Sequence, residues 1–134
     1  MVASQDLGKL ILRATLAILI LFHGFSKLVG GVGFITGLVA KAGLPPAFGY
    51  LVYVGEIVAP LLVLAGVWTR AAALVIAINM AVAIFLVHRG EIFHMNDHGG
   101  AAIELQAMYF FAAVAVLLLG AGRYSAGGSG GRWN

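Results

Sequence analysis

Four long stretches of the chain are almost entirely apolar, and short polar segments separate them. They cover residues 7–28, 47–68, 70–88 and 101–120. A helix of about 20 apolar residues crosses the roughly 30 Å of hydrocarbon in a bilayer. Because lipid offers no hydrogen-bond partners, each spanning segment must satisfy its own backbone, which favours helices. The pattern therefore predicts an all-α polytopic membrane protein built as a four-transmembrane-helix bundle.

The segments between these stretches predict how the helices are connected. Only Thr69 separates the second stretch from the third, so these two helices must form an antiparallel hairpin. Between the first and second stretches, the apolar side chains from Phe34 to Val39 fall on one side of a short helix. That helix is too short to span and is expected to lie in the membrane interface. We expect a transmembrane domain over residues 1–125 and a flexible Gly/Ser-rich tail over residues 126–134.

The composition agrees with lipid as the main solvent. The 134 residues are 62% hydrophobic and only 10% charged, whereas soluble domains average about 25% charged residues. The net charge is +3, and no basic patch with interleaved aromatic residues accompanies it, so nucleic-acid binding is not expected. The chain has no cysteine, which excludes disulfides, thiolate metal ligands and a cysteine nucleophile.

The distribution of Lys and Arg predicts the orientation of the bundle. With alternating helix directions, five basic residues lie on the side of the termini: Lys9, Arg13, Arg70, Arg123 and Arg132. Three lie on the other side: Lys27, Lys41 and Arg89. Because cytoplasmic segments carry an excess of Lys and Arg, both termini are predicted to be cytoplasmic. The opposite end of the bundle is then its outer end.

Polar side chains from all four predicted helices gather at the outer end. The candidates for a pocket there are His23, Lys27, Glu56, His88, Glu104 and Tyr109. A carboxylate below the interface costs roughly 2.5–3.5 kcal/mol unless it is paired or neutralised. We therefore expect Glu56 to pair with Lys27, or Glu104 with His23. Such pairs either fix the helix arrangement alone or belong to a ligand or proton site. For Lys27 a snorkelling side chain is the simpler alternative, and His88 can mark only the end of a span.

Two specific chemistries are compatible with these residues. In the loop before the fourth span, His94 and His98 offer ligands suited to zinc, iron or copper. Their spacing matches no established metal motif, so neither a metal nor a haem is the expected cofactor. A quinone requires less, namely an apolar slot with a hydrogen-bond donor near each carbonyl. The side chains of His23, Lys27 or Tyr109 can supply those donors.

Several short motifs, in this order and spacing, resemble those of the DoxX family of membrane proteins. They are Arg13, His23-Gly24 with Lys27, Gly55-Glu56 leading into LLVLAGVWTRAAAL, Asn96 with Glu104, and a closing GAGRYS. The resemblance covers about residues 7–125 and implies a multi-pass protein of the cell inner (plasma) membrane. The family's polar pattern falls on Arg13, His23, Lys27, Glu56 and Glu104. The chain departs from the family at Ala121, where a proline is common.

The resemblance also implies a function linked to membrane redox complexes. We expect an integral subunit of a quinone-linked redox assembly, which contributes a polar quinone or small-molecule pocket near the outer face or anchors a partner. If the chain is itself an enzyme, it is an oxidoreductase subunit acting with quinone. The alternatives are a protein that binds or transports a small molecule or ion, and a structural accessory subunit without its own activity. Besides lipid, the expected partners are other membrane subunits or further copies of the chain.

Overall fold

The fold was analysed in a computed structural model, which describes residues 3–87, 90, 92–128 and 130–134. Within these residues the regular structure is entirely helical, which confirms the predicted all-α class. The helices are α1 (Ala3–Gly30), α2 (Gly33–Lys41), the 3-10 helix η1 (Pro46–Leu51), the π-helix η2 (Val54–Val58), α3 (Ala59–Ala65), α4 (Thr69–Val87) and α5 (Glu104–Leu119).

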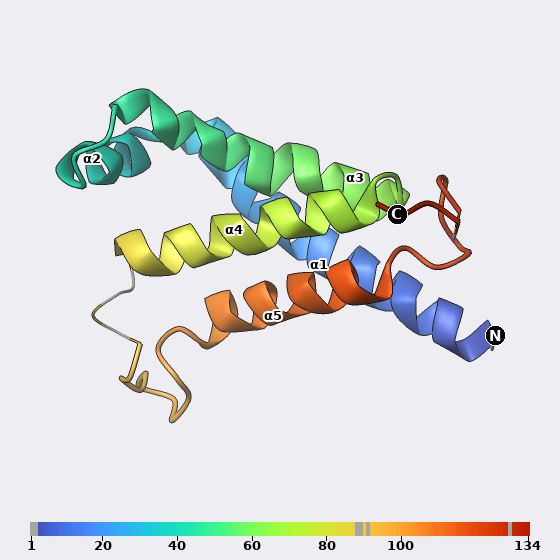
Figure 1. The fold of residues 1–134 in the computed structure, drawn as a ribbon. Coiled ribbons are helices and arrows are strands. Elements are labelled where there is room, and N and C mark those ends of the chain that lie inside the picture. Colours follow the sequence, from blue (N-terminus) through green and yellow to red (C-terminus); the bar gives the residue numbers. More distant parts are fainter. Residues whose placement is uncertain (1–2, 88–89, 91, 129) are drawn as a thin grey trace.

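The long helices form one bundle in which α3, α4 and α5 lie side by side and α1 crosses them obliquely (Figure 1). Helix α4 packs along α5 and α3, and α1 contacts both α3 and α5. Small side chains let the backbones approach closely at the centre: Ala17, Ala73 and Ala113 are completely buried. Larger aliphatic side chains, such as Ile20 and Ile76, fill the spaces between these contacts.

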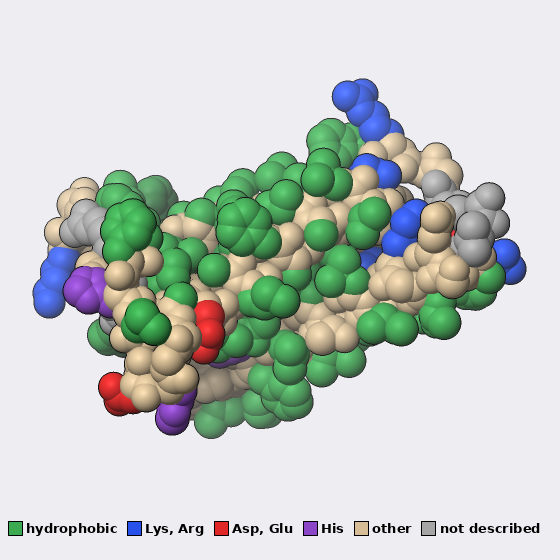
Figure 2. All heavy atoms as spheres, turned by 90° about the horizontal axis from the view of Figure 1, so that it is seen from below, with side chains coloured by type: hydrophobic (Ala, Val, Ile, Leu, Met, Phe, Trp, Pro, Cys, Tyr) green, Lys and Arg blue, Asp and Glu red, His purple; other side chains and the backbone are tan. Residues whose placement is uncertain are grey.

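The helix lengths and the outward side chains show a membrane protein. Among the described residues, three helical stretches are long and apolar enough to cross a bilayer: Ala3–Gly30, Pro46–Ala65 and Thr69–Leu86. The fourth apolar helix, Glu104–Leu119, has only 16 residues and begins three residues after the predicted start at 101. Hydrophobic side chains cover the middle of the molecule, whereas charged and histidine side chains gather towards its two ends (Figure 2).

Both chain termini lie at one end of the bundle, which we call the termini end (Figure 1). The opposite end, called here the loop end, carries α2 and the segment 92–103. The short helix α2 therefore exists where the sequence predicted it, packed against η1. Its position in a membrane interface and the cytoplasmic side of the termini stay predictions.

The termini end is closed by Arg13, whose side chain is only 1% exposed. Its Nη1 donates to the carbonyl of Val63 at 2.7 Å, its Nε to that of Ala121 at 2.9 Å, and its Nη2 to that of Tyr124 at 2.6 Å. These carbonyls belong to the last turn of α3 and to the chain that follows α5. A single guanidinium thus links α1 to α3 and to the chain after α5 through hydrogen bonds to backbone carbonyls, of which that of Val63 also accepts from the Gly66 N–H at 3.2 Å.

The tail returns to the same end of the bundle. Asn134 is buried, and its Oδ1 accepts hydrogen bonds from the backbone N–H and the hydroxyl of Thr69, both at 2.9 Å. Thr69 begins α4, so the Asn134 side chain satisfies a donor that a helix N-terminus leaves free. The flexibility expected for residues 126–134 stays a prediction, and these contacts are where it can be tested.

Candidate functional site

The second span is locally distorted at its acidic residue. Residues Val54–Val58 form a π-helical turn, and both Gly55 and Glu56 are buried within it. Pro60 follows four residues after Glu56 and has no backbone N–H, so the usual α-helical bond to the Glu56 carbonyl is missing. A wider π-turn is a common response to such a gap and is frequent at functional sites.

Helix α1 packs directly against this distorted turn. A Cβ atom placed on Gly24 would lie 2.3 Å from the Glu56 carbonyl oxygen, so only glycine permits the observed approach. On the other side of the turn, a Cβ atom on Gly55 would lie 2.5 Å from the side chain of Asn79 in α4. The two glycines therefore bring α1, η2 and α4 together around Glu56.

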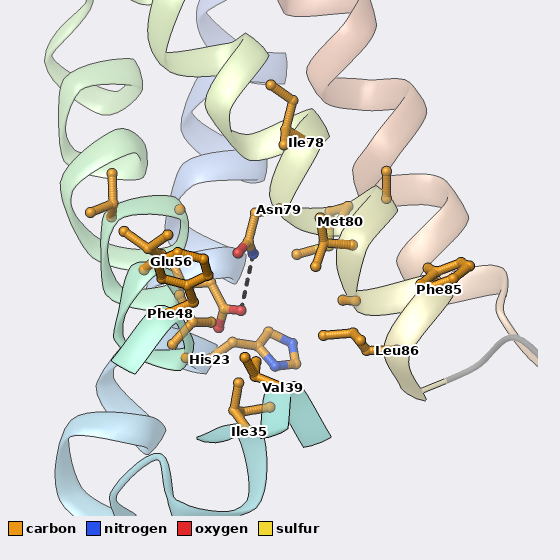
Figure 3. A pocket seen from close by; sticks show the side chains of 18 of the residues that line it. His23, Ile35, Val39, Phe48, Glu56, Ile78, Asn79, Met80, Phe85 and Leu86 are labelled. Atoms are coloured by element: carbon orange, nitrogen blue, oxygen red, sulfur yellow. Dashed lines mark hydrogen bonds between the residues drawn. The ribbon is translucent and has the colours of Figure 1, made fainter. Parts of the chain in front are cut away.

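Glu56 is the centre of a polar cluster at the loop end. It is 4% exposed, and its Oε1 accepts a hydrogen bond from Lys27 Nζ at 2.7 Å within an ion pair. Its Oε2 accepts a bond from Asn79 Nδ2 at 3.2 Å, drawn as the dashed line in Figure 3. Tyr53 donates its hydroxyl proton to the Lys27 carbonyl at 3.0 Å. The structure thus contains the Glu56–Lys27 pair of the two pairings that the sequence predicted.

This cluster forms one wall of a cavity with a volume of about 1090 Å³. Its polar lining comes from α1, η2, α4 and α5: His23, Lys27, Glu56, Asn79, Gln106 and Tyr109. The rest of the lining is apolar and includes Ile35 and Val39 of α2, Phe48 of η1, and Ile78 and Phe85 of α4. In Figure 3 the side chains of Glu56 and Asn79 point towards one another, and Phe85 and Leu86 lie farther along the helix that carries Asn79.

Two further donors stand beside the ion pair. The rings of His23 and Tyr109 meet edge to face, with their centroids 5.7 Å apart and an interplanar angle of 81°. Tyr109 is 9% exposed, and both residues line the cavity. Within the described part of the chain, neither the imidazole nor the phenol hydroxyl makes a hydrogen bond. Both groups are therefore available to a molecule in the cavity.

The predicted site residues are only partly brought together. His23, Lys27, Glu56 and Tyr109 share the cavity, as the depth of each along its helix suggested. Glu104 does not line it, because its carboxylate accepts a bond from Asn96 Nδ2 at 3.1 Å in the preceding loop. His88 lies outside the described residues.

The loop histidines stand apart from the cavity. His94 and His98 are exposed, and no group of three metal-ligating side chains occurs among the described residues. Metal binding at these positions stays an unfavoured prediction. Asn79 and Gln106 were missing from the predicted site. An amide in the middle of the otherwise apolar stretch 71–87 was the signal that could have identified Asn79.

Among the described residues, the lining of the cavity does not extend to the termini end of the bundle. Between it and Arg13 lies a layer of buried apolar side chains: Leu16, Ala17, Ile20, Val63, Ile76 and Val116. Those residues have no groups that could replace the hydration shell of an ion. Within the described residues, this apolar layer separates the polar cluster around Glu56 from Arg13.

Comparison with known proteins gives one match. The family model described as DoxX matches residues 8–89, which include α1, α2, the second span and α4. That range holds Arg13, Lys27, Glu56 and Asn79. No curated protein and no solved structure matches the chain.

Proposed function

Since the chain belongs to the DoxX family, we propose that it is a membrane subunit of a redox assembly and that its cavity binds a quinone. The observation that carries the proposal is the combination of a large apolar cavity with unpaired hydrogen-bond donors at one wall. Such a cavity with a few convergent polar groups is the usual form of a small-molecule site.

The charges at that wall favour an uncharged ligand. Lys27 and Glu56 neutralise one another across 2.7 Å, so a charged head group would meet no counter-charge there. What the wall still offers is donors, from the imidazole of His23 and the hydroxyl of Tyr109. A ligand that accepts two hydrogen bonds and carries no charge matches this wall, and a quinone head group has two carbonyl acceptors.

The apolar lining suits the remainder of such a molecule. Phe48 and Ile78 face the cavity from two different spans, and both are about half exposed, which leaves room for an apolar chain beside them. Burial of that chain supplies affinity at roughly 25 cal/mol for each Å² removed from water. A bound quinone would supply two-electron redox chemistry, and His23 and Tyr109 would orient its carbonyls.

A partner completes the proposed assembly. Within the described residues no metal-ligand cluster is available to pass electrons onward, so a second subunit would have to carry them to or from the quinone. We place the protein in the cell inner (plasma) membrane with both termini in the cytoplasm, on the basis of its excess of Lys and Arg at the termini end. The cavity would then open near the outer face.

The test is the amount of quinone bound by the purified protein. In nanodiscs containing a membrane quinone, we expect stoichiometric retention by the unaltered chain. The double variant His23→Phe with Tyr109→Phe keeps both rings and loses both donors, so retention should fall several-fold. The matched control combines Phe22→Leu with Met108→Leu, the outward-facing neighbours on the same two helices, and should retain quinone normally. Equal retention by all three proteins would refute the proposal and favour an accessory role.

A further inference from the structure

The loop between α4 and α5 exposes three apolar side chains within four residues. Ile92 is 40% exposed, Phe93 97% and Met95 70%. These residues lie at the loop end, and the cavity does not use them. Full exposure of a phenylalanine is unusual, because burying its ring is strongly favourable. The position of these three apolar side chains relative to the bilayer therefore needs an explanation, although the exposed His94 lies between the last two.

Hydrogen bonds hold the loop in this shape. Asn96 Oδ1 accepts a bond from the backbone N–H of Gly100 at 3.0 Å, and its Nδ2 donates to Glu104 Oε1 at 3.1 Å. The backbone pairs as well, from Asn96 N to the Gly100 carbonyl at 2.7 Å and from Ala102 N to the His94 carbonyl at 2.9 Å. The loop is thus a built hairpin, and its apolar side chains are presented outward instead of folding onto the bundle.

Helix lengths give the depth of this hairpin. At the termini end, α4 and α5 are aligned, because Arg70 Nη1 donates to the carbonyls of Leu117 and Leu118, both at 3.1 Å. From there α4 runs for 19 residues and α5 for only 16. At about 1.5 Å per residue α5 is about 24 Å long, which leaves it roughly 6 Å short of crossing the hydrocarbon. With the C-terminal end of α5 placed at one boundary of the hydrocarbon, the start of the helix lies about 6 Å inside the opposite boundary.

The lipid-facing surface of the bundle continues into the hairpin. Leu105 and Met108, in the first turns of α5, are 46% and 70% exposed, and Phe85 near the end of α4 is 58% exposed. Within the hairpin itself, the polar residue Asp97 is exposed as well. The hairpin therefore has the composition of an interfacial element, with apolar groups for the acyl chains and a polar tip for water.

We propose that Phe93 and Met95 insert into the lipid of the loop-end leaflet, at the boundary between head groups and acyl chains. The hairpin then anchors the short helix α5 and sets the level of its first two turns, which carry Gln106 and Tyr109 towards the cavity. The occupant of this surface is a lipid bilayer. A protein partner at the same place is the competing outcome. The inference stands on α5 and its loop alone and does not depend on which molecule the cavity binds.

The absence of cysteine makes the test direct. Phe93→Cys and, as the matched control in the same hairpin, Asp97→Cys are each labelled with a polarity-sensitive fluorophore and reconstituted into vesicles of neutral phospholipid. We expect a blue-shifted emission at position 93 that spin-labelled acyl chains quench several-fold more strongly than at position 97. Aqueous iodide should show the reverse order. Met95→Cys repeats the measurement if labelling at position 93 perturbs the loop.

Equal access of iodide to positions 93 and 97 in pure lipid would overturn the inference. It would also be overturned if position 93 became shielded only in native membranes, because a protein partner would then cover the hairpin. Neither outcome bears on quinone retention, so this test and that of the cavity fail independently.

Discussion

Arg13 and Lys27 are both cations on helix α1, but their surroundings and hydrogen-bond partners differ. At the termini end, Arg13 has all three guanidinium nitrogens bonded to backbone carbonyls and is sealed by the chain that follows α5. At the loop end, Lys27 pairs with Glu56 at the wall of an open cavity, next to donors that have no partner among the described residues. Arg13 therefore has a structural role, because all of its hydrogen bonds are made inside the protein. The cluster around Lys27 and Glu56 can bind a ligand, because neighbouring hydrogen-bond donors are left unpaired.

Replacing Arg13 should have the largest effect on stability. Arg13→Met removes the guanidinium and leaves buried carbonyls without donors, so we expect a loss of about 3–5 kcal/mol in the free energy of unfolding. Reversible unfolding in detergent with increasing SDS measures it. Arg13→Lys should recover only part of the loss, because one ammonium cannot reach the carbonyls of α3 and of the chain after α5 together in the geometry of a guanidinium. Full recovery by lysine would show that charge alone matters there.

The close approach of α1 to the π-turn comes next. Gly24→Ala places a Cβ atom against the backbone carbonyl of Glu56, and backbone cannot move aside as a side chain can. We expect a loss of about 2–3 kcal/mol, at the upper end of overpacking costs. Gly8→Ala on the same helix meets nothing within 4 Å and is the control, for which unfolding should be unchanged or slightly harder. Similar curves for both variants would contradict the packing described for Gly24.

The ion pair of Lys27 with Glu56 should contribute less to the free energy of unfolding than Arg13 does. Glu56→Gln leaves Lys27 without its counter-charge, but the lysine side chain is 24% exposed, so the loss should be about 2 kcal/mol, between the values for buried and surface pairs. In the double variant with Lys27→Gln, the destabilisation should be smaller than the sum of the two single losses. Additive losses in this double-mutant cycle would show that the two groups are not coupled.

The smallest change in stability is expected at His23, where the largest change in binding is expected. His23→Phe keeps the edge-to-face contact with Tyr109 and removes only an unpaired donor, so unfolding should shift by less than about 0.5 kcal/mol. Quinone retention in nanodiscs should nevertheless fall. A large loss of stability with normal quinone retention would mean that the loop-end cluster has a structural role, like Arg13, and does not bind a ligand.

The sequence predicted the architecture well because hydrocarbon thickness and helix rise leave few alternatives for four long apolar stretches. It also indicated the pairing of Lys27 with Glu56 as one of two alternatives, since both lie at the same depth on neighbouring helices. The partners of Arg13 could not be predicted, because two of the four carbonyls that it bonds lie 108 and 111 residues away in an irregular segment. Backbone carbonyls carry no sequence signal.

Local backbone geometry explains the other differences. Predicted as a pocket residue, Glu104 instead bonds Asn96, because α5 begins at Glu104 and the hairpin before it brings an amide within reach. The structure brings Asn79 to Glu56, where the π-turn around Gly55 makes room for it. The position of Pro60 in the sequence does not by itself predict this π-turn, because the structure of the surrounding helix is needed as well.

The most direct test of the central claim is photoaffinity labelling of the reconstituted protein with a light-activated quinone analogue, followed by peptide mapping. The account predicts crosslinks in residues 46–58 and 74–86, which line the cavity, and their loss when unlabelled quinone is added in excess. Crosslinks spread evenly over the outward faces of the helices, or concentrated near Arg13 and insensitive to competition, would contradict it.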